Sequence, residues 1–232
     1  MLDRINNIIN KKYNVTNGYL HLIELLEMQY DLTLDKKCLN SLNITDMDED
    51  YYKKTSFVAE YVAKDNKIKI YNSNSMRDEE LLSSFLHELI HALSSKFINN
   101  DGEELLLQGL NMRNSQGIDS YFLGLNEGIT QMIANHLTLF DDKKAYQFQT
   151  QIASAFCEKL GEVEVVKKYF ENDYESLAEM ITQSNPSIDV YNFIINIYTF
   201  HAGICQNNIG DLNLFNKIME DIGSFSTGTK FV

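Results

Sequence analysis

The stretch LLSSFLHELIHALSS, residues 81–95, combines an amphipathic helical pattern with three chemically notable residues, His87, Glu88 and His91. At about 100° per residue, six of its apolar side chains fall within one arc of the helix, from roughly 160° to 300° when His87 is set at zero: Leu82, Phe85, Leu86, Leu89, Ile90 and Leu93. On the same scale His91 falls at about 40°, on the opposite face. The pattern predicts a helix over residues 76–97, with a ligand-bearing face that points away from the buried face and stays open.

The spacing of the two histidines suits a metal ion. Residues four apart lie one turn apart on one face of a helix, so His87 and His91 can offer two imidazoles to one zinc ion. Glu88 lies beside them, where it can handle the proton of a metal-activated water. The chain holds only five histidines, and its composition predicts on the order of 0.01 chance matches to H-E-x-x-H. A surface helix with two unrelated histidines remains the alternative.

A catalytic zinc site usually has three protein ligands, so a third is expected further along the chain. A third histidine in the arrangement H-E-x-x-H-x-x-G-x-x-H would require Gly at position 94 and His at position 97. These positions hold Ser94 and Phe97, which excludes that class. The best remaining candidate is Glu127.

Glu127 stands in the segment LNEGITQMIANHL, which also has helical periodicity. On a helical wheel Gln131 and Asn135 fall beside Glu127, at about 40° and 80° from it, and the apolar residues fall on the opposite side. Gly128 removes a side chain at a point where two helices that share a metal would have to approach closely. The segment therefore predicts a second helix that presents Glu127 from its polar edge.

The motifs HELIHAL and LNEGIT resemble those of the gluzincin zinc metallopeptidases, the thermolysin-like and aminopeptidase-like clan, whose third ligand is a glutamate on a later helix. HELIH alone also resembles the zinc motif of the clostridial neurotoxin light chains. The resemblance spans about residues 56–140. It implies a zincin-like fold, peptide-bond hydrolysis, zinc ligands His87, His91 and Glu127, and Glu88 as the general base.

Two features of a gluzincin site are not evident. Many gluzincins have an acid four residues after the glutamate ligand, which orients a zinc-bound histidine, and here that position holds the uncharged Gln131. The oxyanion also needs a second donor. Tyr191, Tyr198 and His201 share one face of a later helical segment, but that segment is apolar nearly all round, and aromatic residues there are expected to pack in the core.

The pattern along the chain predicts an α+β protein with a small N-terminal lobe followed by a mostly helical C-terminal lobe. We expect one domain, residues 1–232, with lobes of about 1–124 and 125–232. In the N-terminal lobe we expect helices at 3–12 and 18–30, an acidic loop at 31–54, and two strand pairs, 56–62 with 67–71 and 104–110 with 118–123. In the C-terminal lobe we expect helices at 126–139, 142–160, 162–171, 174–183, 188–206 and 211–223.

Composition and charge narrow the partners. The net charge of −13 argues against nucleic acid and anionic membranes and is compatible with a basic or neutral peptide substrate. No apolar run long enough to span a membrane and no secretory signal is evident, which favours a cytoplasmic location unless export uses another route. Cys38, Cys157 and Cys205 are far apart and are expected to be reduced, mostly buried thiols. The oligomeric state is left open.

Three hypotheses follow from these observations. The first is a zinc endopeptidase or aminopeptidase that uses Glu88 as its base. The second is a zinc-binding regulatory or interaction module without turnover, for which the uncharged Gln131 leaves room. The third is a metal-free helical interaction protein, in which the two histidines have no ligand role. Metal content separates the third hypothesis from the others, and peptide cleavage separates the first two.

Overall fold

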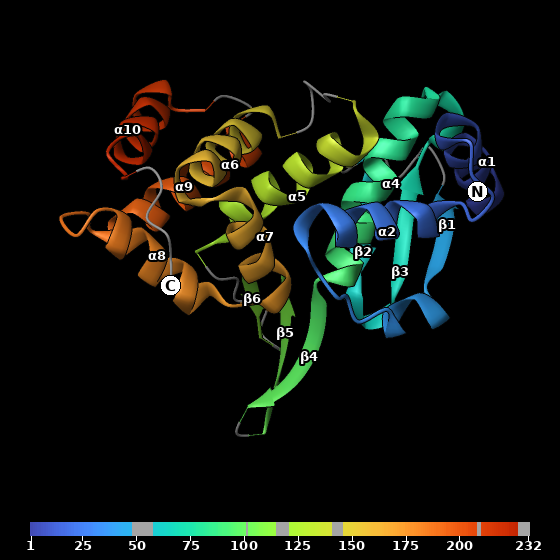
Figure 1. Ribbon diagram of the computed structural model, residues 1–232, viewed down its shortest axis with the longest axis horizontal. Coiled ribbons are helices and arrows are strands. Elements are labelled where there is room, and N and C mark those ends of the chain that lie inside the picture. Colours follow the sequence, from blue (N-terminus) through green and yellow to red (C-terminus); the bar gives the residue numbers. More distant parts are fainter. Residues whose placement is uncertain (48–57, 101, 115–120, 141–145, 208–209, 227–232) are drawn as a thin grey trace. The chain divides into compact units, whose positions relative to one another are not determined.

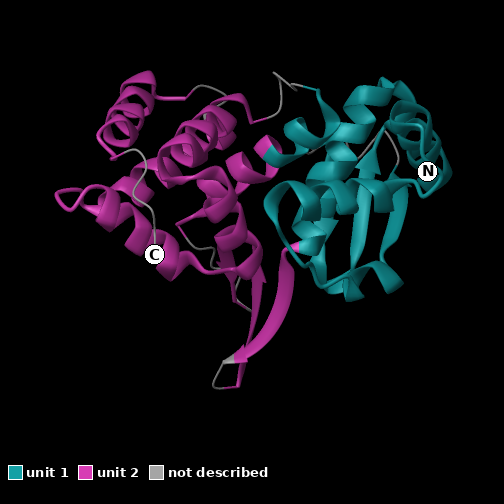
Figure 2. Cartoon of the chain, in the orientation of Figure 1, with its two compact units in different colours: residues 1–93, 133–142 teal, residues 94–132, 143–232 magenta. Residues whose placement is uncertain are grey.

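The computed structural model describes residues 1–47, 58–100, 102–114, 121–140, 146–207 and 210–226 (Figure 1). The chain is an α+β protein in which helices dominate and the described strands form two small sheets, as expected. Its contacts divide it into two compact units, Met1–Leu93 with Ile133–Asp142 and Ser94–Met132 with Lys143–Val232 (Figure 2). The lobes expected from the sequence remain a prediction.

Unit 1 contains the helix with the two histidines. Two helices, α1 (Leu2–Tyr13) and α2 (Tyr19–Tyr30), open the unit and match the predicted pair. The sheet has the order β1 (Asn43–Met47), β3 (Lys67–Tyr71), β2 (Ala59–Val62), with β1 parallel and β2 antiparallel to β3. Helix α4 (Asp78–Leu93) packs against β2, β3 and α1, which fixes the segment that contains His87 and His91.

Short 3-10 turns link these elements, at Lys37–Ser41, Ala63–Asp65 and Ser73–Ser75. The first of them and β1 lie where the sequence predicted only an acidic loop over residues 31–54, so that prediction was wrong. Strand β1 is an edge strand, and none of its residues is fully buried. Its apolar signal is therefore weak, and the pairing of Ile44 with Ile68 is what makes it a strand. Residues 48–54 of the predicted loop lie outside the described residues.

Helix α4 also ends earlier than predicted. It stops at Leu93, whereas the apolar periodicity continues to Phe97. The reason is a competing pairing, because Ser95–Asn100 forms strand β4 and aligns antiparallel with β5 (Glu103–Gln108). Strand β5 pairs on its other side with β6 (Asn111–Arg113).

The second predicted strand pair, 104–110 with 118–123, was therefore only half right, because the first strand exists but has other partners. Residues 104–110 do form most of a strand, but they pair with β4 and β6 rather than with residues 118–123. Leu123 instead begins helix α5 (Leu123–Thr138), and residues 118–120 lie outside the described part of the chain.

Helices make up the rest of the described part of unit 2, and their predicted positions are confirmed to within two residues, except that residues 142–145 of the predicted helix 142–160 lie outside the described residues. They are α6 (Gln147–Leu160), α7 (Glu162–Glu171), α8 (Tyr174–Ser184), α9 (Val190–Asn207) and α10 (Leu212–Gly223). Helix α10 packs on α6 and α9, and α8 packs on α6, α7 and α9. Stacked and edge-on phenylalanine rings join α6, α9 and the segment after α10, as in Phe156, Phe193 and Phe225. The described cysteines are free, as expected, but only Cys157 is buried, so the expectation that they are mostly buried was wrong.

Within the described residues, no helix combines the length and the apolar composition needed to cross a membrane.

Helix α5 approaches α6 very closely at Gly128. A Cβ atom on Gly128 would lie 2.2 Å from the carbonyl oxygen of Gln149 and 3.1 Å from Cβ of Ala153. The first contact is to backbone, which cannot rotate away as a side chain can. The close approach at this glycine is therefore to α6, and not to the helix with the two histidines, as the sequence had suggested. It holds the first turns of α5, which include Glu127, against the helical core of that unit.

Replacing Gly128 with alanine tests this contact. Because the new methyl group has no space, Gly128→Ala should lower the free energy of unfolding by about 3 kcal/mol in a urea titration. Gly203→Ala is the matched control, since a Cβ atom added to Gly203 in α9 would meet nothing within 4 Å. The control should be neutral or stabilising by up to about 1 kcal/mol, through better helix propensity. Equal effects from the two variants would contradict the close approach.

A second prediction concerns the charge on the sheet beneath α4. Burial alone would raise the pKa of Glu60, but hydrogen bonds from Lys69 and Tyr71, with the Lys69 charge, outweigh burial and lower that pKa. A carboxyl group whose pKa is lowered on folding stabilises the protein above its unfolded pKa of about 4.3 and loses that contribution as the pH falls through the folded value.

Between pH 6 and pH 3, the wild type should therefore lose more stability than the Glu60→Gln variant, in which this position has no charge to titrate. Thermal melts across this range measure the difference. Tyr71→Phe, which removes one of the two hydrogen bonds to Glu60, should lose an amount of stability between those of the wild type and Glu60→Gln. Superimposable pH profiles for the wild type and Glu60→Gln would show that the Glu60 interaction contributes nothing.

Candidate metal centre

The two histidines of α4 face each other across one helical turn. Their Nε2 atoms lie 3.1 Å apart, with ring centroids at 4.8 Å and ring planes at 75°. In tetrahedral zinc, with Zn–N bonds of about 2.0–2.1 Å, two ligand nitrogens are separated by about 3.3 Å. The observed separation is close to that value. It also fits a hydrogen bond in which one neutral imidazole donates to the other, so the geometry permits both a metal pair and a metal-free pair.

The polar face of α4 is buried, contrary to the expectation of an open face. His87, Glu88 and His91 are only 4%, 8% and 5% exposed. A helical wheel separates polar from apolar positions, but it does not show which of the two faces the rest of the chain covers. Ser95, which the predicted helix over residues 76–97 would have included, belongs to β4 instead. Three adjacent ionisable groups are costly to bury unless they have partners, which makes this part of α4 a functional candidate rather than a solvated surface.

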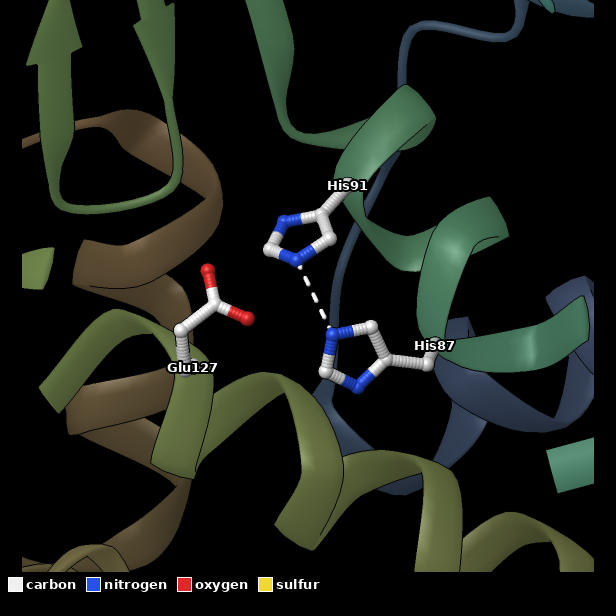
Figure 3. Close-up of side chains that lie close together, drawn as sticks. All are labelled: His87, His91 and Glu127. Carbon is white, nitrogen blue, oxygen red and sulfur yellow. Dashed lines mark hydrogen bonds between the residues drawn. The ribbon is translucent and has the colours of Figure 1, made fainter. Parts of the chain in front are cut away.

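Glu127 completes a possible ligand set. It lies in the first half of α5 and is partly buried. One ligand atom from each of His87, His91 and Glu127 can be chosen so that the three lie within 4.8 Å of one another (Figure 3). This upper limit is wider than the edge of a zinc tetrahedron, about 3.3 Å. Two imidazoles and one carboxylate form a donor set typical of catalytic zinc.

A chain of buried hydroxyl groups holds α5 around Glu127. The Thr130 hydroxyl donates to the carbonyl oxygen of Asn126 at 2.8 Å, and its oxygen lies 2.7 Å from the Tyr169 hydroxyl. Because the Thr130 proton is already used, Tyr169 must donate to Thr130 and can accept from Ser94, whose Oγ lies 3.3 Å away. This series of hydroxyl groups thus connects Ser94, the residue after α4, through Tyr169 of α7 to the turn of α5 that contains Glu127.

Two asparagines extend this network to the strands. The Asn126 side-chain oxygen accepts the backbone N–H of Leu110 at 2.8 Å. The Asn172 amide donates to the carbonyl oxygens of Ser94 and Gly109, at 2.8 and 2.9 Å. Both side chains are buried, so each bond satisfies a backbone group that water cannot reach. Sequence reasoning did not identify Tyr169, Asn126 or Asn172 as supporting residues, because an isolated polar tip carries no periodic signal.

His201 and Cys205 of α9 lie within the electrostatic influence of Glu127. His201 is buried, and the Gln149 amide nitrogen lies 3.1 Å from its Nδ1. With that amide donating to Nδ1, the neutral ring carries its proton on Nε2, which lies 3.6 Å from Sγ of Cys205. Burial lowers the pKa of His201, and the charge of Glu127 opposes the shift. The ring therefore favours its neutral form.

The Cys205 thiol is unsuited to nucleophilic chemistry. Burial raises its pKa, and the charge of Glu127 raises it further. A thiol with a raised pKa stays protonated at neutral pH and is a weak nucleophile and metal ligand. Cysteine chemistry therefore has no support at this position, even though Cys205 is exposed on α9.

The three candidate oxyanion donors have different environments. His201 is buried and hydrogen-bonded, in line with the core role expected for it. Tyr198 is only half-buried, and Tyr191 is exposed, so core packing was the wrong expectation for Tyr191. Gln131, which stands where many gluzincins have an acid, is buried.

Comparisons with known proteins add no assignment: no family model, no curated protein and no solved structure matches this chain.

Proposed function

We propose that this protein is a zinc-dependent metallopeptidase with a zincin-like fold, in which His87, His91 and Glu127 hold the zinc ion. The observation that supports the proposal is the approach of the three ligand atoms to within 4.8 Å, in a chain whose sequence has H-E-x-x-H on one of the two helices concerned. The substrate is a peptide or an unfolded protein segment. The net charge of −13 is compatible with a neutral or basic substrate.

Zinc bound at these residues supplies Lewis acidity, which polarises a carbonyl group and activates water at neutral pH. The residues of the chain do the rest. His87 and His91 bind as neutral imidazoles through the nitrogens that face each other. Glu127 adds one negative charge, which offsets part of the charge of the ion.

Glu88 is the general base of the proposal. It follows His87 directly on α4 and is 8% exposed, so its carboxylate acts in a site with little bulk water. The carboxylate takes the proton of the attacking water and then delivers that proton to the leaving amine. Hydrogen-bond donors and charges act more strongly in such a site than they do in water.

A zinc-binding module without turnover is the second candidate. It is favoured by Gln131, whose amide can accept a hydrogen bond from a ligating histidine but cannot raise the basicity of that histidine as a carboxylate does. The peptidase proposal remains the better one, because binding alone would not require Glu88 beside the ligands. An activity assay with matched variants separates the two.

The Glu88→Gln variant is the direct test. Because the amide cannot accept the proton of the attacking water, hydrolysis of denatured casein should fall at least about 100-fold while the zinc content is unchanged. Glu79→Gln is the control, since Glu79 is an exposed glutamate in the first turn of the same helix. It should retain wild-type activity.

Three outcomes are informative. Activity retained in Glu88→Gln would refute the assigned role of this residue. Wild-type protein that binds zinc but cleaves neither casein nor a random peptide mixture would favour the non-catalytic module. Activity that survives removal of zinc by a chelator would show that the hydrolysis has another origin.

A further inference from the structure

Three tyrosine rings of unit 2 meet at the surface. Tyr121 stands just before α5, and Tyr191 and Tyr198 lie on α9. The Tyr121 ring is edge-on to both of the others, with centroid distances of 6.0 Å to Tyr191 and 5.6 Å to Tyr198. We call these three residues the tyrosine cluster. Although the rings contact one another, Tyr191 is 61% exposed and Tyr121 is 49% exposed.

Such exposure is unusual for aromatic rings that already pack together. Edge-to-face contact covers part of the surface of each ring, yet most of the Tyr191 surface remains exposed to water. A folded chain gains free energy by burying rings of this size. Clustered tyrosines left accessible at a surface are typical of binding sites, because they offer large, rigid and amphipathic contact area at a low cost in side-chain entropy.

Contacts within unit 2 place the tyrosine cluster close to Glu127. Helices α5 and α9 touch at Gly124, where an added Cβ atom would lie 2.8 Å from Cβ of His201 and 3.0 Å from the carbonyl oxygen of Ile197. Tyr121 precedes this crossing by three residues and Glu127 follows it by three. On α9, Tyr198 precedes His201 by three residues in the same way, and the charge of Glu127 acts on His201.

On both helices the tyrosine cluster thus lies about one turn from the point where α5 and α9 touch, and Glu127 lies one turn beyond that point on α5. At a rise of 1.5 Å per helical residue, Leu123 and Glu127 are roughly 6 Å apart along α5, and Tyr121 precedes Leu123 by two residues, so Tyr121 and Glu127 are separated by roughly 10 Å along this segment. An extended peptide advances about 3.3 Å per residue. A peptide whose scissile bond lies at Glu127 would place a side chain two or three residues away beside the tyrosine cluster.

We propose that the tyrosine cluster is a substrate subsite, which binds an aromatic side chain two or three residues from the bond that is cleaved. The proposal rests on the peptidase function proposed above. An aromatic ring is the best-matched occupant, because the exposed edges and faces of Tyr121 and Tyr191 allow further edge-to-face contacts.

The absence of tryptophan from this chain gives a clean probe. A short peptide such as acetyl-Ser-Gly-Trp-Gly-Ser-amide can be excited selectively above the absorption of tyrosine, so its fluorescence anisotropy reports binding without background from the protein. The same peptide with alanine in place of tryptophan is the unlabelled competitor. Both are titrated against the full-length, zinc-loaded protein and against the chelator-treated protein.

The peptide anisotropy should rise with protein concentration, and the alanine peptide should fail to compete at equal concentration. Tyr191→Ala should weaken binding about five- to tenfold, from the loss of one aromatic partner. Tyr191→Phe, which keeps the ring, should retain binding. Leu212→Ala is the control, because Leu212 is an apolar residue of α10 in the same unit with a matching exposure of 60%, and it should bind as the wild type does.

Cleavage-site mapping then connects the subsite to the chemistry. With denatured β-casein, aromatic residues should be enriched two or three positions from the cleaved bonds, and Tyr191→Ala should remove that enrichment while leaving zinc content unchanged. Equal affinity and equal cleavage positions in Tyr191→Ala and wild type would overturn the subsite.

The outcomes also distinguish this proposal from the peptidase itself. Casein cleavage without binding of the tryptophan peptide would reject the subsite and leave the peptidase standing. Tyr191-dependent binding without any hydrolysis would reject the peptidase and reduce the cluster to an aromatic binding site, so the subsite as proposed would also fall. A shift from dimer to monomer in Tyr191→Ala by sedimentation, with no peptide binding in either form, would show that a second copy of the chain covers the cluster.

Discussion

The candidate metal centre depends on the helical repeat that places His87 and His91 on one side of α4 with their Nε2 atoms 3.1 Å apart. Two imidazoles at this distance either share a proton or share a metal ion. Because the pair is buried, one of these two arrangements is required: without a shared proton or an ion, the lone pairs of the two facing nitrogens would repel each other, and water could not relieve the repulsion. Glu88 and Glu127 add the carboxylates that a peptidase would need, one as base and one as ligand.

The rest of each unit serves to fix these side chains. In unit 1, α4 rests on β2, β3 and α1, and the Glu60, Lys69 and Tyr71 interactions tie the two strands together. In unit 2, the hydroxyl chain through Tyr169 and the glycine contact at Gly128 set the position of the α5 turn that contains Glu127. A ligand is useful only if its supporting contacts are rigid; the contacts in unit 2 are buried or made to backbone, and those of Glu60 in unit 1 are part-buried.

Local patterns were enough to predict the helices and the first strand pair. Apolar periodicity located α7 and α9 almost residue for residue, because these helices bury one continuous face. Pairing between distant segments was not predictable from local patterns. Edge strand β1 has few apolar residues, and β4 lies in a stretch that continues the pattern of α4, so in both cases the tertiary contact decided the conformation.

For the candidate site, the sequence predicted the residues but not their environment. The spacing of H-E-x-x-H and the segment around Glu127 suggested the three residues whose ligand atoms lie within 4.8 Å. Their burial, the support from Tyr169 and Asn172, and the exposure of Tyr191 could not be predicted, because each depends on which elements cover a face and not on the periodicity of that face.

Metal content is the most direct test of the central claim. Elemental analysis of the purified chain, after zinc loading and removal of excess ion, should give one zinc per molecule. His91→Ala should abolish it and Glu127→Ala should weaken it, whereas His136→Ala, an exposed histidine of α5, should bind as the wild type does. No zinc in the wild type after loading, or equal zinc in His91→Ala, would contradict the account and would leave His87 and His91 as a hydrogen-bonded pair.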